Sequence, residues 1–107
     1  MIEVQLKSFV DAKRHKDEEL RKQLDFGYFW NGQTALLFEF SPQRNNPTNI
    51  LELLFAKLRF VKSSKLWKLY WMRRSGRWEA YEQKPEASNL QKILTEIDHD
   101  GYGCFFG

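Results

Sequence analysis

The alternation of apolar and polar positions is most regular from residue 53 to residue 78, where it has the period of two that is typical of strands. Two small polar pairs, Ser63-Ser64 and Ser75-Gly76, interrupt the pattern. Such pairs form two-residue hairpin loops. With a loop at each place, the middle strand pairs with a neighbouring strand on both sides, and each of its residues keeps the same face in both pairings. The stretch therefore predicts a three-stranded antiparallel meander.

One face of this meander is predicted to point into the protein, and it holds Ala56, Leu58, Phe60, Trp67, Leu69, Trp71, Trp78 and Ala80. The outward face mixes cations with aromatic residues, namely Lys57, Arg59, Lys68, Tyr70, Met72, Arg77, Glu79 and Tyr81. The second loop sets Tyr70 opposite Tyr81. The first sets Arg59 opposite Lys68, and this like-charge contact is unfavourable unless an anion lies between the two side chains.

A second hairpin is predicted over residues 26–40, because Asn31-Gly32 separates two alternating apolar runs. Both faces of this hairpin are apolar. Gln33 and Glu39 fall on one face, so we expect the other face to point inward, with Gly27, Phe29, Leu36, Phe38 and Phe40. The remaining set, Phe26, Tyr28, Trp30 and Leu37, would then need a covering helix or a partner protein.

The segments on either side of the two hairpins complete the picture. Residues 2–24 predict one helix whose polar middle, residues 13–22, can break, bend or project into solvent. Pro42 and Pro47 bracket a predicted loop over residues 41–49, and residues 50–55 fit either a helical turn or early entry into the next strand. A short helix is predicted from Ser88 or Asn89 to Ile97. The apolar tail, with Tyr102, Phe105 and Phe106, is expected to dock on the body.

The elements add up to a single α+β domain over residues 1–107. Its expected parts are an N-terminal helix, an antiparallel meander sheet of about five strands, a short C-terminal helix and the docked apolar tail. A chain of 107 residues is long enough to form one hydrophobic core.

Charge narrows the choice of partner. Lys and Arg number 17 against 14 Asp and Glu, so the net charge is only +3 and the basic character is local. An anionic partner at one patch is expected.

Cys104 is the only cysteine, which excludes an intramolecular disulfide and a multi-thiolate zinc site and fits a reducing compartment. The N-terminus has no apolar signal core and no run approaches a membrane span, so we expect a cytoplasmic protein without a membrane partner.

Four short motifs together resemble a family. They are Glu39-Phe-Ser-Pro42, Trp67-Lys-Leu-Tyr-Trp71, Arg77-Trp-Glu-Ala-Tyr81 and the terminal Gly103-Cys-Phe-Phe-Gly107. In order, spacing and terminal position they resemble the bacterial family called domain of unknown function 3024, over residues 24–107. The resemblance implies a small bacterial α+β protein with no established activity, and it supplies no catalytic residues.

Residues with catalytic or metal-binding chemistry are few. Cys104 is expected to be a packed thiol, because its nearest histidine along the chain is His99 and no base is evident beside it. Asp98, His99, Asp100 and Cys104 include possible ligands but lack the spacing of a calcium loop. We therefore expect no metal, no cofactor and no catalytic residue. An enzyme whose pocket holds Glu39 and His99 is kept as a lesser alternative.

The strongest functional signal is the basic aromatic face. Rings that stack on bases, together with cations that follow phosphates, are typical of proteins that bind single-stranded nucleic acid. The candidate binding residues are Lys57, Arg59, Lys68, Tyr70, Arg77 and Tyr81. The plainer interpretation of the same pattern, which we prefer on the sequence alone, is a solvated outer face or tyrosine rings covered by the N-terminal helix. The leading functional hypothesis is a non-enzymatic binding module for an anionic partner such as nucleic acid. The alternative is a protein-interaction or homodimerisation domain that uses Tyr28, Trp30 and Leu37.

Overall fold

The structure is a computed structural model that describes residues 2–82, 84–100 and 105. Its elements in chain order are α1 (Ile2–Lys13), α2 (Glu18–Arg21), β1 (Asp25–Trp30), β2 (Thr34–Gln43), β3 (Asn46–Val61), β4 (Leu66–Met72), β5 (Trp78–Ala80), β6 (Glu86–Ala87) and α3 (Leu90–His99). The strands form one antiparallel sheet in the order β1-β2-β3-β4-β5, and β6 also pairs with β4. The α+β prediction, in which a meander sheet follows an N-terminal helix in the chain and precedes a short C-terminal helix, is confirmed.

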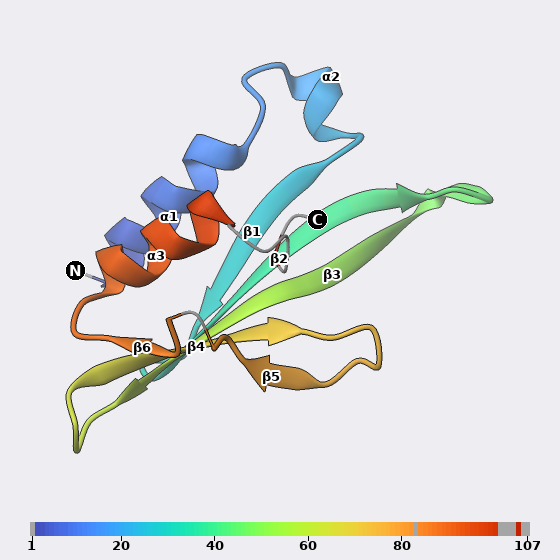
Figure 1. Ribbon diagram of the computed structural model, residues 1–107. Helices are drawn as coiled ribbons and strands as arrows, with labels where there is room; N and C mark the ends of the chain where they lie inside the picture. The colour runs from blue at the N-terminus through green and yellow to red at the C-terminus, as the bar shows by residue number, and fades with distance from the viewer. Residues whose placement is uncertain (1, 83, 101–104, 106–107) are drawn as a thin grey trace.

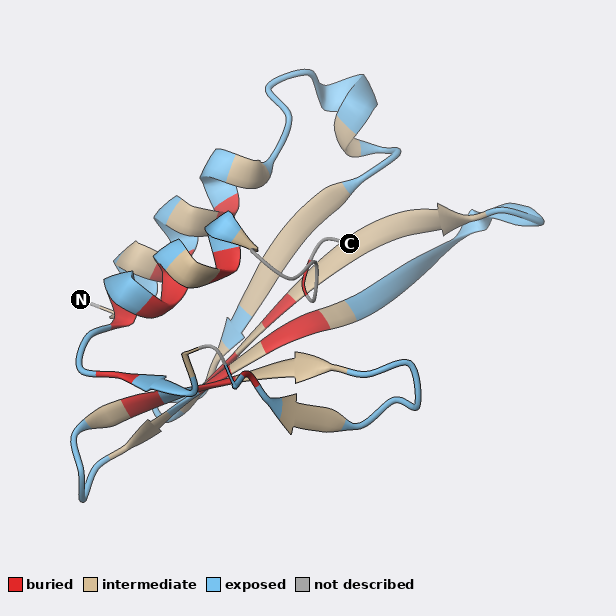
Figure 2. Ribbon diagram, in the orientation of Figure 1, coloured by how far each residue is buried: buried red, intermediate tan, exposed pale blue. Residues whose placement is uncertain are grey.

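The two longer helices pack on the same face of the sheet (Figure 1). Leu6 and Val10 of α1 are buried there, together with an apolar stripe of α3 that consists of Leu90, Ile93, Leu94 and Ile97. Buried residues lie between these helices and the middle of the sheet, whereas the far end of the β2–β3 hairpin is exposed (Figure 2). The core is therefore one layer between the helix pair and one sheet face.

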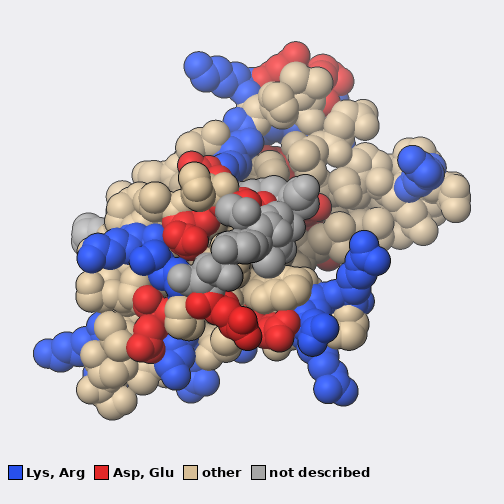
Figure 3. All heavy atoms as spheres, in the orientation of Figure 1, with Lys and Arg blue, Asp and Glu red and all other residues tan. Residues whose placement is uncertain are grey.

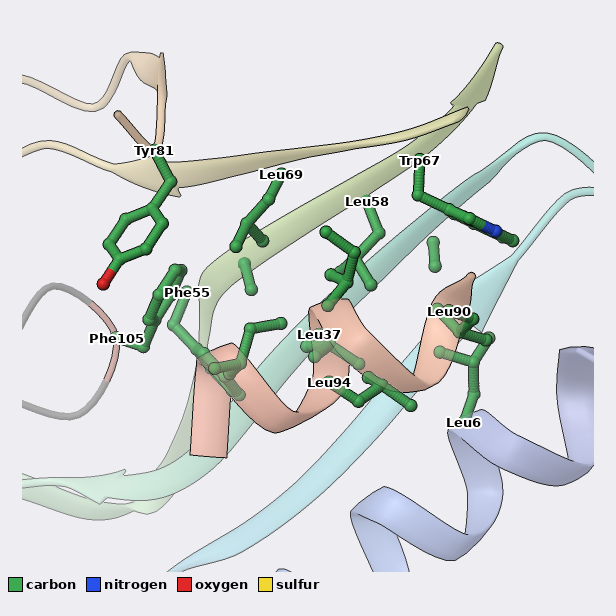
Figure 4. Close-up of a cluster of buried hydrophobic side chains, with 14 of the residues drawn as sticks. Leu6, Leu37, Phe55, Leu58, Trp67, Leu69, Tyr81, Leu90, Leu94 and Phe105 are labelled. Carbon is green, nitrogen blue, oxygen red and sulfur yellow. The ribbon is translucent and has the colours of Figure 1, made fainter. Parts of the chain in front are cut away.

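The register between β3 and β4 is the one that the sequence predicts. Phe60 pairs with Trp67, Leu58 with Leu69 and Ala56 with Trp71. Leu58, Leu69 and Trp67 point toward the helices (Figure 4), and their exposed fractions do not exceed 4%. The loop is longer than the predicted pair, because the Lys65 amide donates to the Val61 carbonyl at 2.8 Å. The register is unchanged by this difference.

The register between β4 and β5 differs from the prediction by one residue. Trp78 pairs with Met72 and Ala80 pairs with Tyr70. The cause is a three-residue loop, Arg74-Ser75-Gly76, in which the Gly76 amide donates to the Arg73 carbonyl at 2.9 Å and Gly76 has φ +83°. A third loop residue in the left-handed conformation is typical of hairpins with a bulge at the turn. Because of the shift, Trp78 and Ala80 leave the predicted inward set.

The choice of inward face in the first hairpin was wrong, although the grouping of residues was right. Tyr28 pairs with Leu37 and Phe29 with Leu36, as expected for two alternating strands. However, Leu37 is completely buried and Phe29 is 49% exposed. The inward set is therefore Phe26, Tyr28, Trp30, Ala35 and Leu37, and the outward set is Gly27, Phe29, Leu36, Phe38 and Phe40. Gln33 lies in the loop, and the half-buried Glu39 shares its face of β2 with Leu37, so neither marks the solvent face.

A β-bulge in β3 bends the sheet around the core. The register with β2 shifts between Leu37, which pairs with Ala56, and Phe38, which pairs with Leu54. The extra residue, Phe55, is buried together with Ala56, and its ring meets Phe26 edge-on at 6.2 Å. A bulge opposes two residues to one and increases the local bend. Consequently two consecutive side chains contribute to the core.

The predicted loop over residues 41–49 is mostly strand. β2 continues to Gln43 and β3 begins at Asn46, so the β2–β3 hairpin projects from the body (Figure 1). Pro42 is tolerated because its missing amide falls on the β1 side of β2, and β1 pairs with β2 only as far as Phe40. Among the described residues, no strand is therefore present to accept a hydrogen bond at position 42. Pro47 falls where the register between the strands is irregular.

The predicted N-terminal helix breaks within its polar middle. Asp17 caps α2 by accepting from the Glu19 amide at 2.9 Å. Between the helices, Arg14 donates two hydrogen bonds to Asp25, from Nε at 2.7 Å and from Nη2 at 2.9 Å. The Arg14 hydrogen bonds are the main reason that the pKa of Asp25 is lowered. This ion pair ties the segment after α1 to the start of β1.

The C-terminal helix begins where the sequence predicts. Asn89 caps α3, and its side chain accepts from the Lys92 amide at 2.9 Å. Phe105 docks as expected, because it is buried and its amide donates to Asp100 Oδ1 at 3.1 Å. Tyr102 and Phe106 lie outside the described residues.

Candidate functional site

The sheet face opposite the helices, which we call the open face, carries the candidate site. The strand register places on it Phe29, Leu36, Phe38, Phe40, Leu54, Lys57, Arg59, Lys68, Tyr70, Met72, Trp78 and Ala80. None of these residues is buried, and α1 and α3 pack on the other face. The described part of the chain therefore leaves a broad sheet surface with aromatic, aliphatic and basic side chains in contact with solvent.

The basic half of the open face lies on β3 and β4. Lys57 pairs with Tyr70, and Lys57 Nζ lies 5.3 Å from the centre of the tyrosine ring, a cation–π distance. Arg59 lies directly opposite Lys68. Among the described residues, neither of these two cations nor Lys57 forms an ion pair within 4.0 Å. Their charges are therefore available to an anion in solution.

The apolar half of the open face lies on β1 and β2. Phe38 pairs with Gly27, and its ring occupies the space where a side chain at position 27 would stand. Phe38 also meets Phe40 edge-on at 5.1 Å. Phe29 is the most exposed ring of this half. The two halves meet along one row of cross-strand neighbours, in which Leu36 lies beside Lys57.

Four of the six predicted binding residues share this face: Lys57, Arg59, Lys68 and Tyr70. Arg77 does not, because its carbonyl accepts from Arg73 in the β4–β5 turn and it stands one position before Trp78. Tyr81 was wrongly placed beside Tyr70. It is only 2% exposed and its ring lies 5.0 Å from Phe105 in the core (Figure 4).

Two residues of the site were missed in the sequence. Trp78 lies diagonally beside Tyr70 on the open face, and the signal that would have placed it there is the glycine at the third position of its loop. Glu86 of β6 pairs with Lys68 and brings an acid to the edge of the basic half. The two-residue strand β6 has no sequence pattern that predicts it.

The residues proposed for the alternative, protein-interaction function do not form an exposed surface. Leu37 is completely buried, and Tyr28 and Trp30 pack against the core beneath the helices. Trp30 also lies 5.7 Å from Trp67, ring centre to ring centre. The second apolar side that the sequence predicts does exist, but it consists of the set around Phe29 and Phe38.

The residues kept for the alternative enzyme stand on different elements. Glu39 lies on β2 opposite Leu53, and His99 is the last residue of α3. Within residues 2–82, 84–100 and 105 no three His, Cys, Asp or Glu side chains come together as a metal site. Cys104 lies outside the described residues. No described helix has the length and apolar character needed to cross a membrane.

Comparison with known proteins agrees with the motifs. No curated protein and no solved structure matches the chain. The family model described as Domain of unknown function (DUF3024) matches residues 1–107, so the likeness covers α1 and α2 as well as the motifs of residues 24–107. The chain therefore belongs to the family named Domain of unknown function (DUF3024).

Proposed function

We propose that this protein is a non-enzymatic, cytoplasmic binding module that holds single-stranded nucleic acid on the open face. A single cysteine suits the reducing cytoplasm. A sheet face that combines exposed rings with cations matches the two needs of single-strand binding, which are platforms for bases and charges for phosphates. An open sheet surface also suits unstacked bases better than a duplex, whose base edges are reached through grooves.

The observation that carries this proposal is the pairing of Arg59 with Lys68 on the uncovered face. Two like charges on directly opposite residues are destabilising in the free protein. A phosphate bound between them would relieve the repulsion, because it accepts hydrogen bonds from both side chains. Binding at this point therefore recovers free energy that folding has lost.

The aromatic part of the site lies next to this pair along β4. Tyr70 is the neighbour of Lys57 on one side and a diagonal neighbour of Trp78 on the other. Two adjacent rings on a sheet offer stacking surfaces for successive bases, each worth about 1–3 kcal/mol. Lys57, close to the ring of Tyr70, would reach the phosphate of a stacked nucleotide.

The test is the salt dependence of binding to a fluorescently labelled oligothymidylate, followed by anisotropy. We expect micromolar affinity at low salt and a steep fall as salt rises, because bound phosphates release counterions. The double variant Arg59→Ala, Tyr70→Ala should bind at least tenfold more weakly. A control that removes one exposed cation and one exposed polar side chain from α1, Lys7→Ala with Ser8→Ala, should bind like the wild type. Equal affinity of both double variants would reject the site.

A second candidate function is homodimerisation through the apolar half of the open face. The observation in its favour is the exposure of Phe29 beside the half-buried Leu36 and Phe38. A second copy could cover this patch with its own apolar half, as in face-to-face sheet packing. Sedimentation velocity over a wide concentration range tests this candidate. A monomer at every concentration rejects it, and a dimer that Phe29→Ser dissociates supports it.

A further inference from the structure

The geometry points to a definite path for the nucleic acid, which runs lengthwise along β4 from the β3–β4 loop to the β4–β5 loop. This inference rests on the proposed function and adds the direction and the length of the bound segment. It follows from two clusters of Lys and Arg side chains, one at each end of β4, and from the aromatic residues that lie between them.

The first cluster surrounds the β3–β4 loop. Lys62 and Lys65 are exposed in this loop. On the open face the pair next to the loop is Val61 with Leu66, and the pair after it is Arg59 with Lys68. The loop is well defined, because the Lys65 amide donates to the Val61 carbonyl and Lys65 has φ +57°. Four cations thus flank one end of β4.

The second cluster surrounds the β4–β5 loop. Arg73, Arg74 and Arg77 are exposed around a turn in which the Arg73 amide donates to the Arg77 carbonyl at 2.9 Å. Arg73 also forms an ion pair with Glu79, Nε to Oε2 at 3.3 Å, so Arg74 and Arg77 are the more available cations. Lys and Arg side chains stand out at the end of this hairpin in Figure 3. The register removes Arg77 from the open face, but Arg77 is exposed at the turn itself, one position before Trp78, and so stands beside the end of the path.

The surface between the clusters suits a single strand. From Leu66 to Met72, β4 spans about 20 Å. Along it stand Tyr70 and, on the adjoining β5, Trp78, with Lys57 on the other side. A path of this length with both end loops corresponds to roughly six nucleotides, within the 4–16 that small single-strand-binding folds cover.

The competing path runs across the strands. It would follow the row Phe29, Leu36, Lys57 and Tyr70, which ends at an apolar ring and carries one cation. Phosphates along that row would be placed on hydrocarbon, where their charge is poorly solvated. The lengthwise path has cations at both ends and in the middle, so it suits a polyanion better.

Oligothymidylates of 3 to 15 nucleotides, with a duplex of equal length as comparison, test the path. We expect affinity to rise with length and to level off at roughly six nucleotides. One variant removes a cation pair from the first loop, Lys62→Gln with Lys65→Asn, where asparagine tolerates the left-handed backbone. The other removes Arg74 and Arg77 as glutamine. Each should lower the slope of log K against log salt by about 1.4, since two phosphate contacts are lost on a single strand.

Controls and outcomes separate the two claims. Lys7→Gln with Lys16→Gln removes the same charge from exposed positions of the N-terminal region and should leave the slope unchanged. If the loop variants bind like the wild type while Arg59→Ala with Tyr70→Ala binds weakly, the lengthwise path is overturned and the proposed function stands. If Phe29→Ser lowers the affinity and the loop variants do not, the bound strand follows the crosswise path. Tighter binding of the duplex, or no binding of any oligonucleotide, would overturn both.

Discussion

Phe38 lies against the backbone of Gly27 on the neighbouring strand, where an added β-carbon would stand 2.5 Å from Phe38 Cε2. A ring that covers a glycine on the adjacent strand shields backbone that would otherwise be exposed. The two positions are therefore coupled, and glycine is needed only while the ring is present.

A double-mutant cycle measures this coupling. Gly27→Ala should lower the free energy of unfolding by about 1 kcal/mol, because the Phe38 ring must move. In a Phe38→Ala background the same change should be neutral or stabilising, since alanine restricts the unfolded chain more than glycine does. Urea denaturation of the four proteins gives the interaction term. An identical cost in both backgrounds would contradict the contact.

The Arg14–Asp25 ion pair predicts a dependence of stability on pH. The Asp25 pKa lies below its ordinary value of 3.8, first because of the hydrogen bonds from Arg14 and also because of the Phe26 amide. A carboxylate with a lowered folded pKa stabilises the protein above its unfolded pKa, and this contribution is lost as pH falls through the folded value.

We therefore expect Asp25→Asn to be less stable than the wild type at pH 7, with the difference shrinking below about pH 4. Side chains of Arg14 and Asp25 are 41% and 21% exposed, so solvent limits the effect to about 1 kcal/mol. Thermal unfolding at a series of pH values provides the measurement. Glu82→Gln, which alters an exposed acid, serves as the control. A constant difference across the acid range would contradict the assignment.

The β4–β5 turn depends on a left-handed residue at position 76. Gly76 has φ +83°, with nothing within 4 Å of an added β-carbon, so strain and not crowding determines the cost of substitution. Gly76→Ala should destabilise by about 1 kcal/mol and Gly76→Asn by clearly less, because asparagine adopts this conformation more readily. Ser75→Ala in the same loop is the control. Equal stabilities for the alanine and asparagine variants would argue against this backbone.

The projecting part of β3 has one edge that β4 does not cover, since pairing with β4 begins only at Ala56. Leu51 and Leu53 are 38% and 49% exposed there, with Glu52 between them. A charge in an uncovered strand opposes pairing with a second copy. Glu52→Val should therefore promote self-association, seen as a rise in light scattering with concentration, while Glu82→Val should not. A monodisperse Glu52→Val protein would show that the edge is protected in another way.

Glu86 opposes Lys68 at the margin of the basic half. If the open face binds phosphates, Glu86→Gln should raise the affinity for oligothymidylate severalfold at low salt and have little effect at high salt, because the removed repulsion is screened. Glu82→Gln changes the net charge equally and should alter the affinity less. An unchanged affinity in Glu86→Gln would place the bound strand away from Lys68.

The accuracy of the sequence predictions depended on how unequal the two faces of each strand were. In β3 and β4 the apolar set of Leu58 and Leu69 alternates with the charged set of Arg59 and Lys68, so only one register buries the right side chains. In β1 and β2 both sets are apolar. Alternation then groups the residues correctly but cannot choose the buried group, which is set by the side on which α1 packs.

Loop length caused the error that mattered most for the site. A two-residue loop at Ser75-Gly76 would require a positive φ at Ser75, whereas the three-residue loop places the positive φ on Gly76. One residue of difference moved Tyr81 into the core and brought Trp78 out of it. The bulge at Phe55 left no such trace in the sequence, because its neighbours are apolar on both sides.

Because the helices cover only one side of the sheet, adjacent positions along β3 and β4 alternate between the hydrophobic core and the open face. Leu58 and Leu69 are completely buried in the core, and the adjacent Arg59, Lys68 and Tyr70 lie on the opposite face of the sheet. Substitutions at the open-face positions of a strand can therefore accumulate without changing the buried positions of the same strand. Substitutions at the outward positions of the meander would change the chemistry of the open face and leave the buried register as it is.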